Sequence, residues 1–351
     1  MNVRLQNISF VVISHNEEKN IRDCMNSLIE LDYPKDLYEI IVIDSSTDRT
    51  KEIVREYRTV KLINSDIKFF PVVRNIGLKT ANYDLIAFID ADCVVPPDWI
   101  QKILPNFKDN KIAGVGGNAY PPLNSKFLGK CIAAIGKPAG GAIGFDSELG
   151  DCGNEAHFLG TGHSMFRKNI LVEVGGFDEK LKHGDEDNEL CERILDAGYI
   201  LKYEPSSFLY HKPRETLKEF IKWSFKRGRG SYLANRVPLW KLVLNPFSIL
   251  WIALFLLFSG YIIFNFRITE VLLTILSIIF SGLIFVKLLS YRGIFPTGRE
   301  KIKLLIQRRK RIGVTLIHIS FIILPLFFID RLIMNLGGIY QFLDDYNRSL
   351  K

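Results

Sequence analysis

The chain has 351 residues, of which 48% are hydrophobic, and it carries a formal net charge of +8 at pH 7. This length and composition allow one large domain or two ordinary ones with a sizeable core, and they exclude a disordered chain. Many basic residues lie between apolar runs late in the sequence, and few aromatic residues that could stack on bases lie among them. The charge therefore favours a membrane surface and excludes nucleic acid as a partner.

Cysteine usage and the N-terminus indicate the compartment. The five cysteines include no CxxC pair, so we expect neither a disulfide framework nor a zinc site, and a reducing environment fits best. The first residues are polar and lack the apolar stretch of a signal peptide. The N-terminal domain is therefore expected in the cytosol.

Residues 1–240 alternate short apolar runs, rich in β-branched residues, with helical patterns. Buried strands are predicted at 8–14, 38–44, 60–64 and 84–89, with helices such as 20–31 and 50–57 between them. Because strand and helix alternate, we predict an α/β fold with a mostly parallel sheet.

Polar side chains follow the predicted strands at the sheet edge where ligands of parallel sheets gather. Ser14, Asn16 and Glu17 follow the first strand, and Asp44 ends the second. A carboxylate that ends a buried strand can accept hydrogen bonds from a base or a ribose. The Ser/Thr/Asp turn at 46–48 is also explained by capping of the next helix.

The fourth strand runs into Asp90-Ala91-Asp92. Two carboxylates one residue apart on a strand end suit a hard divalent cation, Mg²⁺ or Mn²⁺, that also binds a diphosphate. Such triplets are common in ordinary turns, so the prediction depends on the position after a buried strand. A cation here would neutralise charge that develops on a leaving phosphate.

Asp187 opens a helical pattern that continues through Leu190 and Ile194 and stops at Gly198. An acid at this place is either a base that takes a proton from an acceptor hydroxyl or an ordinary acidic helix start. The helix start favours its ionised form, while Asp185 and Glu186 oppose it. The sequence alone leaves the balance open.

Two glycine-containing segments allow similar alternatives. Residues 129–144 are rich in Gly and Ala, as in a loop that admits an acceptor or in a plain connector. Residues 226–230 (KRGRG) either close over a diphosphate, with Arg227 as a binding cation, or form a basic patch beside the membrane.

Three long apolar runs follow and predict a membrane domain of residues 241–351. The expected transmembrane helices lie at about 247–266, 271–289 and 312–329. A buried helical core is the alternative, which the absence of any charged residue or polar face in 247–264 and 271–286 disfavours. Because basic loops lie on the cytoplasmic side of a membrane, we expect the loop 290–311 and residues 1–240 on that side. Residues 331–351 lie on the far side or form an interfacial helix.

Six motifs resemble, in their order, the signature of glycosyltransferase family 2. They are 11–18 (VVISHNEE), 41–48 (IVIDSSTD), 74–78 (RNIGL), 90–92 (DAD), 175–179 (GGFDE) and 186–191 (EDNELC). The resemblance covers roughly the first 230 residues. It implies the GT-A nucleotide-diphospho-sugar transferase fold and transfer with inversion of the anomeric centre.

The resemblance also implies roles for particular residues. Asp187 corresponds to the catalytic base, and Asp92 and His211 correspond to positions that hold the metal. The remaining assignments form one nucleotide-sugar-binding set: Ser14, Asn16, Glu17, Asp44, Arg74, Asp90, Ala91, Asp92, Glu186 and Arg227. His211 is equally explained as a structural histidine.

We therefore expect a multi-pass glycosyltransferase of the cell membrane with a cytosolic catalytic domain. It would move a sugar from a nucleotide-sugar donor to a lipid-linked or membrane-proximal acceptor, in contact with membrane lipids. The alternatives are a polyprenyl- or dolichyl-phosphate sugar synthase, a processive polysaccharide synthase and a non-catalytic membrane scaffold. Processive members of the family carry Gln-x-x-Arg-Trp where this chain has SFKRG at 224–228, which disfavours that alternative.

Overall fold

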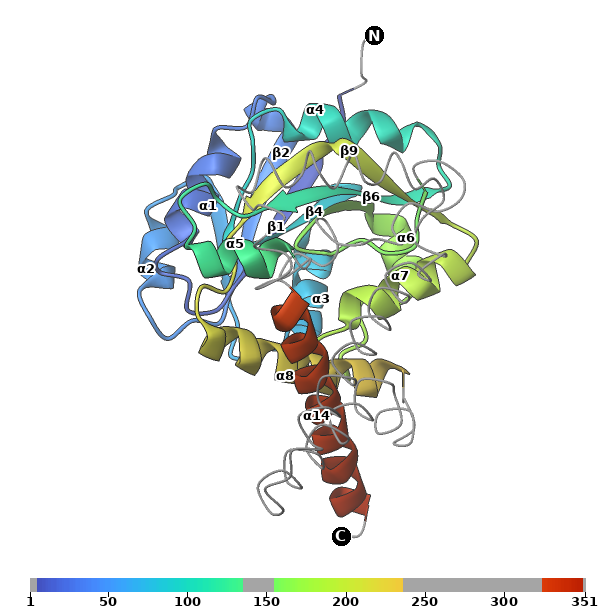
Figure 1. The fold of residues 1–351 in the computed structure, drawn as a ribbon. Coiled ribbons are helices and arrows are strands. Elements are labelled where there is room, and N and C mark those ends of the chain that lie inside the picture. Colours follow the sequence, from blue (N-terminus) through green and yellow to red (C-terminus); the bar gives the residue numbers. More distant parts are fainter. Residues whose placement is uncertain (1–4, 135–154, 236–323, 350–351) are drawn as a thin grey trace, which may run out of the picture.

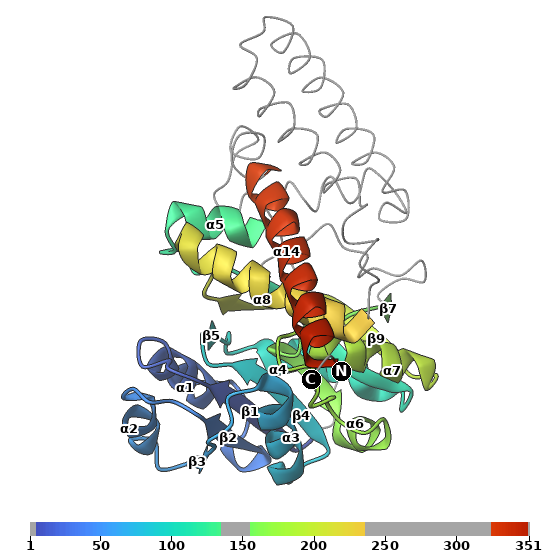
Figure 2. The same ribbon diagram turned by 90° about the horizontal axis from the view of Figure 1, so that it is seen from below.

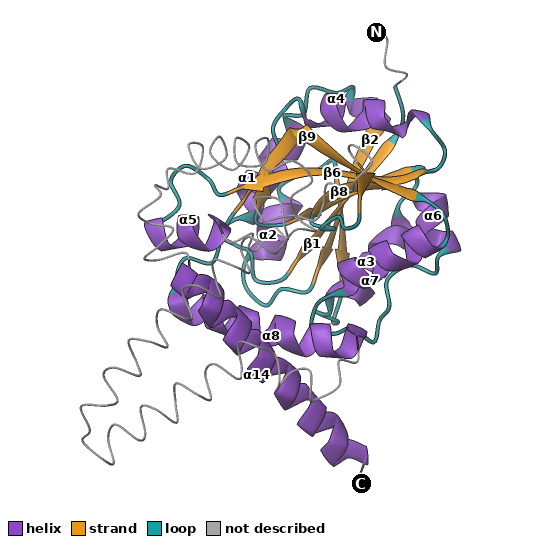
Figure 3. Cartoon of the chain, turned by 45° about the vertical axis from the view of Figure 1, so that its right-hand side comes forward, coloured by secondary structure: helices purple, strands orange, loops and turns teal. Residues whose placement is uncertain are grey.

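The computed structural model describes residues 5–134, 155–235 and 324–349. Nine strands within these residues form one sheet: β1 (Ile8–Ser14), β2 (Tyr38–Asp44), β3 (Val60–Asn64), β4 (Leu85–Asp90), β5 (Cys93–Val94), β6 (Ile112–Tyr120), β7 (Glu155–Ala156), β8 (His163–Arg167) and β9 (Ile200–His211). The strand order is β3-β2-β1-β4-β8-β6-β9-β5, with β7 beside β9. The sheet forms the central layer of the domain (Figures 1 and 3).

The first four strands are parallel, with β1 between β2 and β4. Phe10 and Val12 of β1 belong to one apolar cluster, whereas Val11 and Ile13 belong to the cluster on the opposite face. Successive side chains of a strand point to opposite faces, so a strand covered on both sides reads as one continuous apolar run. This is why the sequence predicts β1 and β2 with their exact bounds.

Helices cover both faces of the sheet. The described helices are α1 (Ile21–Ile29), α2 (Thr50–Arg55), α3 (Phe70–Thr80), α4 (Trp99–Ile103), α5 (Phe127–Ala134), α6 (Lys168–Glu173), α7 (Glu186–Asp196), α8 (Leu217–Asn235) and α14 (Leu324–Ser349), with short 3₁₀ helices η1 (Lys35–Leu37) and η2 (Leu104–Lys108). The apolar cluster on one face includes residues of α1, α2 and α4. The cluster on the other face includes residues of α3, α6 and α7.

The second half of the sheet is mixed. β8 pairs antiparallel with both β4 and β6, β9 runs parallel to β6, and β5 and β7 pair antiparallel with β9. Most paired residues of the whole sheet still lie in parallel pairs, which confirms the prediction of an α/β fold with a mostly parallel sheet.

A third apolar cluster lies outside the main sheet core, where α5, α8 and α14 meet (Figure 2). Phe220 of α8 and Leu326 of α14 are buried in it beside Ile132 of α5. The C-terminal helix therefore packs on the same body as the strands, although it begins almost 90 residues after α8 ends.

Several expectations change in detail. β3 is only half-buried, because it forms the edge of the sheet and lacks a neighbour on one side. Residues 127–134 form α5, so this part of the predicted glycine-rich loop is helical. The predicted spans 247–266 and 271–289, the loop 290–311 and most of 312–329 lie outside the described residues. Residues 324–329 begin α14, and no helix of the described part of the chain is both long and apolar enough to cross a bilayer.

Candidate active site

The carboxyl ends of three parallel strands bring the first group of predicted residues together. Ser14 of β1 is the register partner of Asp44 of β2, and Ile13 is the partner of Asp90 of β4. These three strand ends therefore lie side by side, as the sequence predicts for the edge where parallel strands end.

Asp44 is fully buried at this edge. Its carboxylate accepts hydrogen bonds from the Ser14 hydroxyl, from the Ser46 hydroxyl at 2.7 Å and from the Ser46 backbone N–H at 2.9 Å. Lys51 Nζ lies 4.0 Å from Oδ1. These hydrogen bonds fix the hydroxyls of Ser14 and Ser46 against the buried carboxylate.

The turns after β1 and β2 are joined to each other. Asn16 adopts a positive φ of 60°, and its side-chain oxygen accepts a hydrogen bond from the Thr47 N–H at 2.8 Å. Its own N–H donates to Ser46 Oγ at 2.7 Å. Glu17 also joins the two turns, because its backbone N–H donates a hydrogen bond to Thr50 Oγ1 at 2.9 Å. Asn16 and Glu17 are thereby held beside the strand ends.

Burial, together with the charge of Asp92, raises the pKa of Glu17 to about 7. The Asn20 amide donates to the Glu17 carboxylate at 2.6 Å and opposes this rise. Glu17 and Asp92 therefore lie close enough to influence each other's charge, which connects the turn after β1 to the Asp90-Ala91-Asp92 triplet.

The three residues of the triplet have different surroundings. Asp90 receives a long hydrogen bond of 3.5 Å from Arg74 Nη2, and its carboxylate leaves no room for a side chain at Gly162. Ala91 is buried in the apolar cluster below. Asp92 Oδ1 lies 3.1 Å from His211 Nε2, and Arg214 Nη1 lies 3.4 Å from Oδ2.

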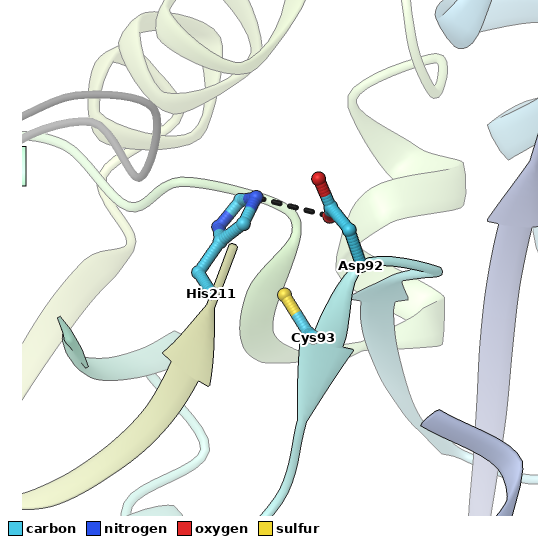
Figure 4. Close-up of side chains that lie close together, drawn as sticks. All are labelled: Asp92, Cys93 and His211. Carbon is cyan, nitrogen blue, oxygen red and sulfur yellow. Dashed lines mark ion pairs between the residues drawn. The ribbon is translucent and has the colours of Figure 1, made fainter. Parts of the chain in front are cut away.

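Asp92 and His211 form the group that fits a divalent cation. The antiparallel register of β5 and β9 pairs Cys93 with His211, and the ligand atoms of Asp92, Cys93 and His211 all lie within 4.8 Å of one another (Figure 4). Adjacent ligands of an octahedral ion at about 2.1 Å are about 3 Å apart, close to the separation of the Asp92 and His211 atoms. One carboxylate and one imidazole suit Mn²⁺.

Asp92 and His211 each favour the charged form of the other, as their pKa values show. Burial alone would raise the pKa of Asp92, but His211 and Arg214 outweigh it and hold this pKa below its usual value. Burial opposes protonation of His211, and Asp92 overcomes this effect and raises the His211 pKa. His163 lies buried nearby, and burial with the charge of His211 lowers its pKa to about 3.

Arg74 of α3 connects the triplet to the start of α7. Its guanidinium is buried, donates to Glu186 and reaches Asp90 at 3.5 Å. The rings of Phe70 and Phe177 lie 5.5 and 5.7 Å from its central carbon. Burial opposes the charge of Arg74, but Glu186, Asp90 and Asp187 outweigh it and raise its pKa.

Asp187 follows Glu186 in the first turn of α7. Burial, strengthened by the charge of Glu186, raises its pKa to about 7, and Arg74 opposes this rise. The preceding Asp185 has a left-handed backbone with φ of 74°. The helix start therefore holds a carboxyl group that is half-ionised near neutral pH, which suits a proton acceptor.

Lys226 and Arg227, in the basic segment of α8, contact different aromatic rings. Arg227 lies over the ring of Trp223 at 4.9 Å, whereas Lys226 Nζ lies 4.8 Å from the ring of Phe70, which also contacts Arg74. Burial lowers the pKa of Lys226, and the charge of Glu186 opposes this effect. Lys226 thus lies near the Arg74–Glu186 pair.

The sequence prediction missed three residues of this arrangement: Cys93, His163 and Arg214. Lys226 lies in the predicted segment 226–230, in which Arg227 was the expected binding cation. Arg214 stands three residues after His211, at the end of β9, and this spacing alone was a usable signal. Antiparallel pairing of β8 with β4 brings His163 to the site, and antiparallel pairing of β5 with β9 brings Cys93 beside His211. No local sequence pattern predicts either pairing.

Comparison with known proteins shows which family and which solved structures this chain resembles. The sequence profile of Glycosyl transferase family 2 matches residues 9–175. Two solved structures share the fold: mannosyltransferase PcManGT from Pyrobaculum calidifontis, in complex with GDP-Man and Mn²⁺, with a TM-score of 0.52 over 77% of this chain and 84% of that chain, and GalNAc-T7 with UDP, GalNAc and Mn²⁺, with a TM-score of 0.51 over 68% and 52%. Both are 18% identical to this chain, so they establish the fold alone.

Residues 9–175 are therefore similar to glycosyltransferase family 2, and the described part of the chain has the GT-A fold. Among curated relatives, poly-beta-1,6-N-acetyl-D-glucosamine synthase of Staphylococcus aureus is 29% identical over 278 residues, which cover 73% of this chain and 65% of the synthase. Glycosyltransferase AglE of Haloferax volcanii is 26% identical over 247 residues, which cover 66% of this chain and 76% of that protein.

Proposed function

We propose that the chain is an inverting, metal-dependent glycosyltransferase that moves a sugar from a nucleotide-sugar donor to a lipid-linked or membrane-proximal acceptor. One observation carries the proposal: Arg74 contacts both Asp90 and Glu186. This contact joins the end of β4, where we expect the donor diphosphate, to the start of α7, where the candidate base lies. A donor and an acceptor held on these two elements would meet in a fixed orientation.

We assign the cation to Asp92 and His211. Mn²⁺ or Mg²⁺ bound there would supply positive charge to the leaving diphosphate. The low pKa of Asp92 supports this assignment, since it keeps the carboxylate ionised at neutral pH. The two solved structures that share the fold contain Mn²⁺, which is consistent with a cation at this edge of the sheet.

Asp187 is the proposed catalytic base. It would accept the proton of the acceptor hydroxyl while that oxygen forms a bond to the anomeric carbon. The bond from this carbon to the diphosphate oxygen breaks, and its electron pair leaves with the diphosphate, so a single displacement inverts the centre. A pKa of about 7 keeps enough Asp187 ionised near neutral pH while it remains a useful base.

The donor would occupy the strand ends and the residues joined to them. Arg74, with Arg227 and Lys226 from α8, supplies positive charge for the diphosphate. Asp44 is buried beneath the Ser14 and Ser46 hydroxyls, so we place it as the group that orients these hydroxyls toward the nucleoside. The remaining donor contacts are assigned to Asn16, Glu17, Asp90, Ala91 and Glu186.

We further propose that residues 1–240 form a cytosolic catalytic domain and that residues 241–351 attach it to the cell membrane. The bilayer-length apolar runs and the basic loop support this arrangement. An acceptor carried by a membrane lipid would then reach Asp187 without leaving the bilayer.

Extension of a polysaccharide is a second candidate function. The resemblance to poly-beta-1,6-N-acetyl-D-glucosamine synthase favours it, although the aligned region spans only 65% of that relative. The stretch SFKRG at 224–228, which lies in α8, lacks the Gln and Trp of processive members. Single transfer is therefore the preferred proposal, and product length distinguishes the two.

The test is a donor screen with the full chain in native lipid and Mn²⁺, in which UDP-N-acetylglucosamine and GDP-mannose are included. We expect release of nucleoside diphosphate from at least one donor, with loss in Asp92→Ala and Asp187→Asn. Asp98→Asn is the matched control, because this exposed aspartate only pairs with Lys102. A wild-type chain that neither binds nor turns over any donor would refute the proposal and favour a membrane scaffold.

A further inference from the structure

Helix α8 lies between the C-terminal helix α14 and the turn that carries the proposed base. On one side, α8 packs against α14 (Figure 2), and the two helices approach each other at Gly228 and Gly337. A side chain at Gly228 would overlap the Met334 carbonyl oxygen, and a side chain at Gly337 would overlap the Phe225 carbonyl oxygen. The two backbones are therefore in direct contact, and any larger residue at Gly337 must move one helix away from the other.

Polar and aromatic contacts fix this crossing. The Ser224 hydroxyl donates to Asp330 Oδ1 at 2.6 Å, and both residues are fully buried. Arg229 Nε donates to Gln341 Oε1 at 2.7 Å. The ring of Phe225 lies 5.6 Å from that of Tyr340. The crossing has one defined geometry because a shift of either helix would leave buried polar groups unpaired.

On the other side, α8 contacts the turn before α7. A Cβ atom at Gly230 would lie 2.5 Å from the Gly184 carbonyl oxygen. Residues two positions apart on a helix point about 200° away from each other, so Gly228 faces α14 while Gly230 faces this turn. The Ser231 hydroxyl also hydrogen-bonds the Asp185 side chain.

The turn in question sets the direction of the proposed base. Asp185 has a positive φ of 74° and immediately precedes α7. Its backbone thus determines where Glu186 and Asp187 point. Glu186 reaches Arg74, and Lys226 of α8 lies over the ring of Phe70, which also contacts Arg74.

We propose that α14 positions Asp187 through α8, with Gly337, Gly228, Gly230 and Ser231 as positioning residues. The C-terminal helix thereby belongs to the working catalytic unit, although about 140 residues separate it from the base. Moving α14 displaces the Gly184–Asp187 turn. A misplaced base then slows the chemical step more than donor binding is weakened, because most of the proposed donor contacts belong to the ends of β1, β2 and β4 and the turns after them. This inference rests on the proposed function.

The experiment compares Gly337→Leu with Leu336→Ala in the full chain in native lipid. Leu336 is an exposed neighbour on the same helix and serves as the matched control. The donor is the one that the wild type turns over in the screen above. We expect kcat to fall at least about tenfold in Gly337→Leu, as a small displacement of a reacting group predicts. Donor KM should rise by a clearly smaller factor, because Lys226, Arg227 and Glu186 supply only part of the proposed donor contacts. Leu336→Ala should match the wild type.

Ser231→Ala provides a second variant that leaves the packing of α8 intact. It should lower kcat about fivefold or more, again with a clearly smaller change in donor KM. This variant tests the inference if Gly337→Leu does not fold. A folded Gly337→Leu chain with wild-type kcat would overturn the inference, as would parallel losses in kcat and donor affinity. A wild-type chain without donor turnover would instead refute the proposed function, so the two failures are distinct.

Discussion

Asp187 is the residue whose charge state most directly sets the expected rate. Its pKa, raised to about 7 by burial and by Glu186, means that the base form gains population as the pH rises toward 8. We predict that kcat/KM increases about tenfold per pH unit below pH 6 and levels off above pH 8. Asp187→Asn should lower kcat by about 10²- to 10⁴-fold and abolish this acid limb. A variant that keeps its activity would indicate an acceptor, such as a lipid phosphate, that needs no base.

The same carboxyl group should cost stability. An unfolded aspartate ionises with a pKa of about 3.9, whereas folded Asp187 ionises only near pH 7. The folded state therefore binds the proton more tightly, and its stability is lost as the pH rises from about 4 to 7. We predict that Asp187→Asn raises Tm relative to the wild type, with a difference that grows from pH 5 to pH 7 and then stays constant. Asn188→Ala, which removes no titrating group, should show a pH-independent difference.

Asp92 and His211 should dominate binding of the cation. Asp92→Asn removes an ionised oxygen ligand and His211→Ala removes the adjacent nitrogen. Each change should weaken Mn²⁺ binding at least about tenfold, measured by electron paramagnetic resonance of the free ion. Cys93→Ser should alter Mn²⁺ affinity by no more than about twofold, because hard ions prefer oxygen and nitrogen to sulfur. Equal Mn²⁺ affinity in Asp92→Asn would place the cation elsewhere.

At the scale of elements, helix α3 approaches β1 through Gly77. A side chain at Gly77 would overlap Val11 Cγ1. Gly77→Ala should therefore destabilise the fold by about 1–3 kcal/mol, as overpacking of a core does, against a gain of about 1 kcal/mol in helix propensity. Urea unfolding measures the difference, with the exposed Lys79→Ala as the control on the same helix. Val11→Ala should be less destabilising in the Gly77→Ala background than alone.

The first four strands could be predicted from sequence because each is a β-branched run between turn residues. β1, β2 and β3 have the predicted bounds, and β4 is shifted by one residue. β6 was missed because Gly114 and Gly116 weaken any strand pattern. These glycines are required by their neighbours, since side chains there would crowd Phe166 and Ser164 of β8. Long-range pairing, rather than local preference, makes this segment a strand.

The candidate site divides in the same way. Ser14, Asp44 and Asp90 were predictable, because parallel register alone brings their strand ends together. The pair of Arg74 and Glu186, which are 112 residues apart, was not. Each residue belongs to a recognisable motif, but no local pattern shows that the buried Arg74 guanidinium contacts both Asp90 and Glu186. The contact arises from the packing of α3 and α7 on one face of the sheet.

At the scale of the whole molecule, α14 extends the catalytic body with residues from the C-terminal end of the chain. Leu326 is buried beside Phe220, and Asp330 accepts the buried Ser224 hydrogen bond. Burial of one leucine contributes about 1.5–3 kcal/mol, which is a large part of a typical stability of about 5–15 kcal/mol. Loss of the helix would also leave Ser224 without its acceptor.

Deletion of residues 324–351 should therefore lower Tm by about 10 °C, since each kcal/mol shifts it by about 2–4 °C in a domain of this size. It should also expose Trp223, which packs against the same cluster. A red shift of tryptophan fluorescence and faster quenching by iodide would report this exposure. Removal of residues 350–351 alone keeps all of α14 and is the control. An unchanged Tm and spectrum after the longer deletion would mean that the α8–α14 contact contributes nothing to the fold, and that residues 5–235 are complete without it.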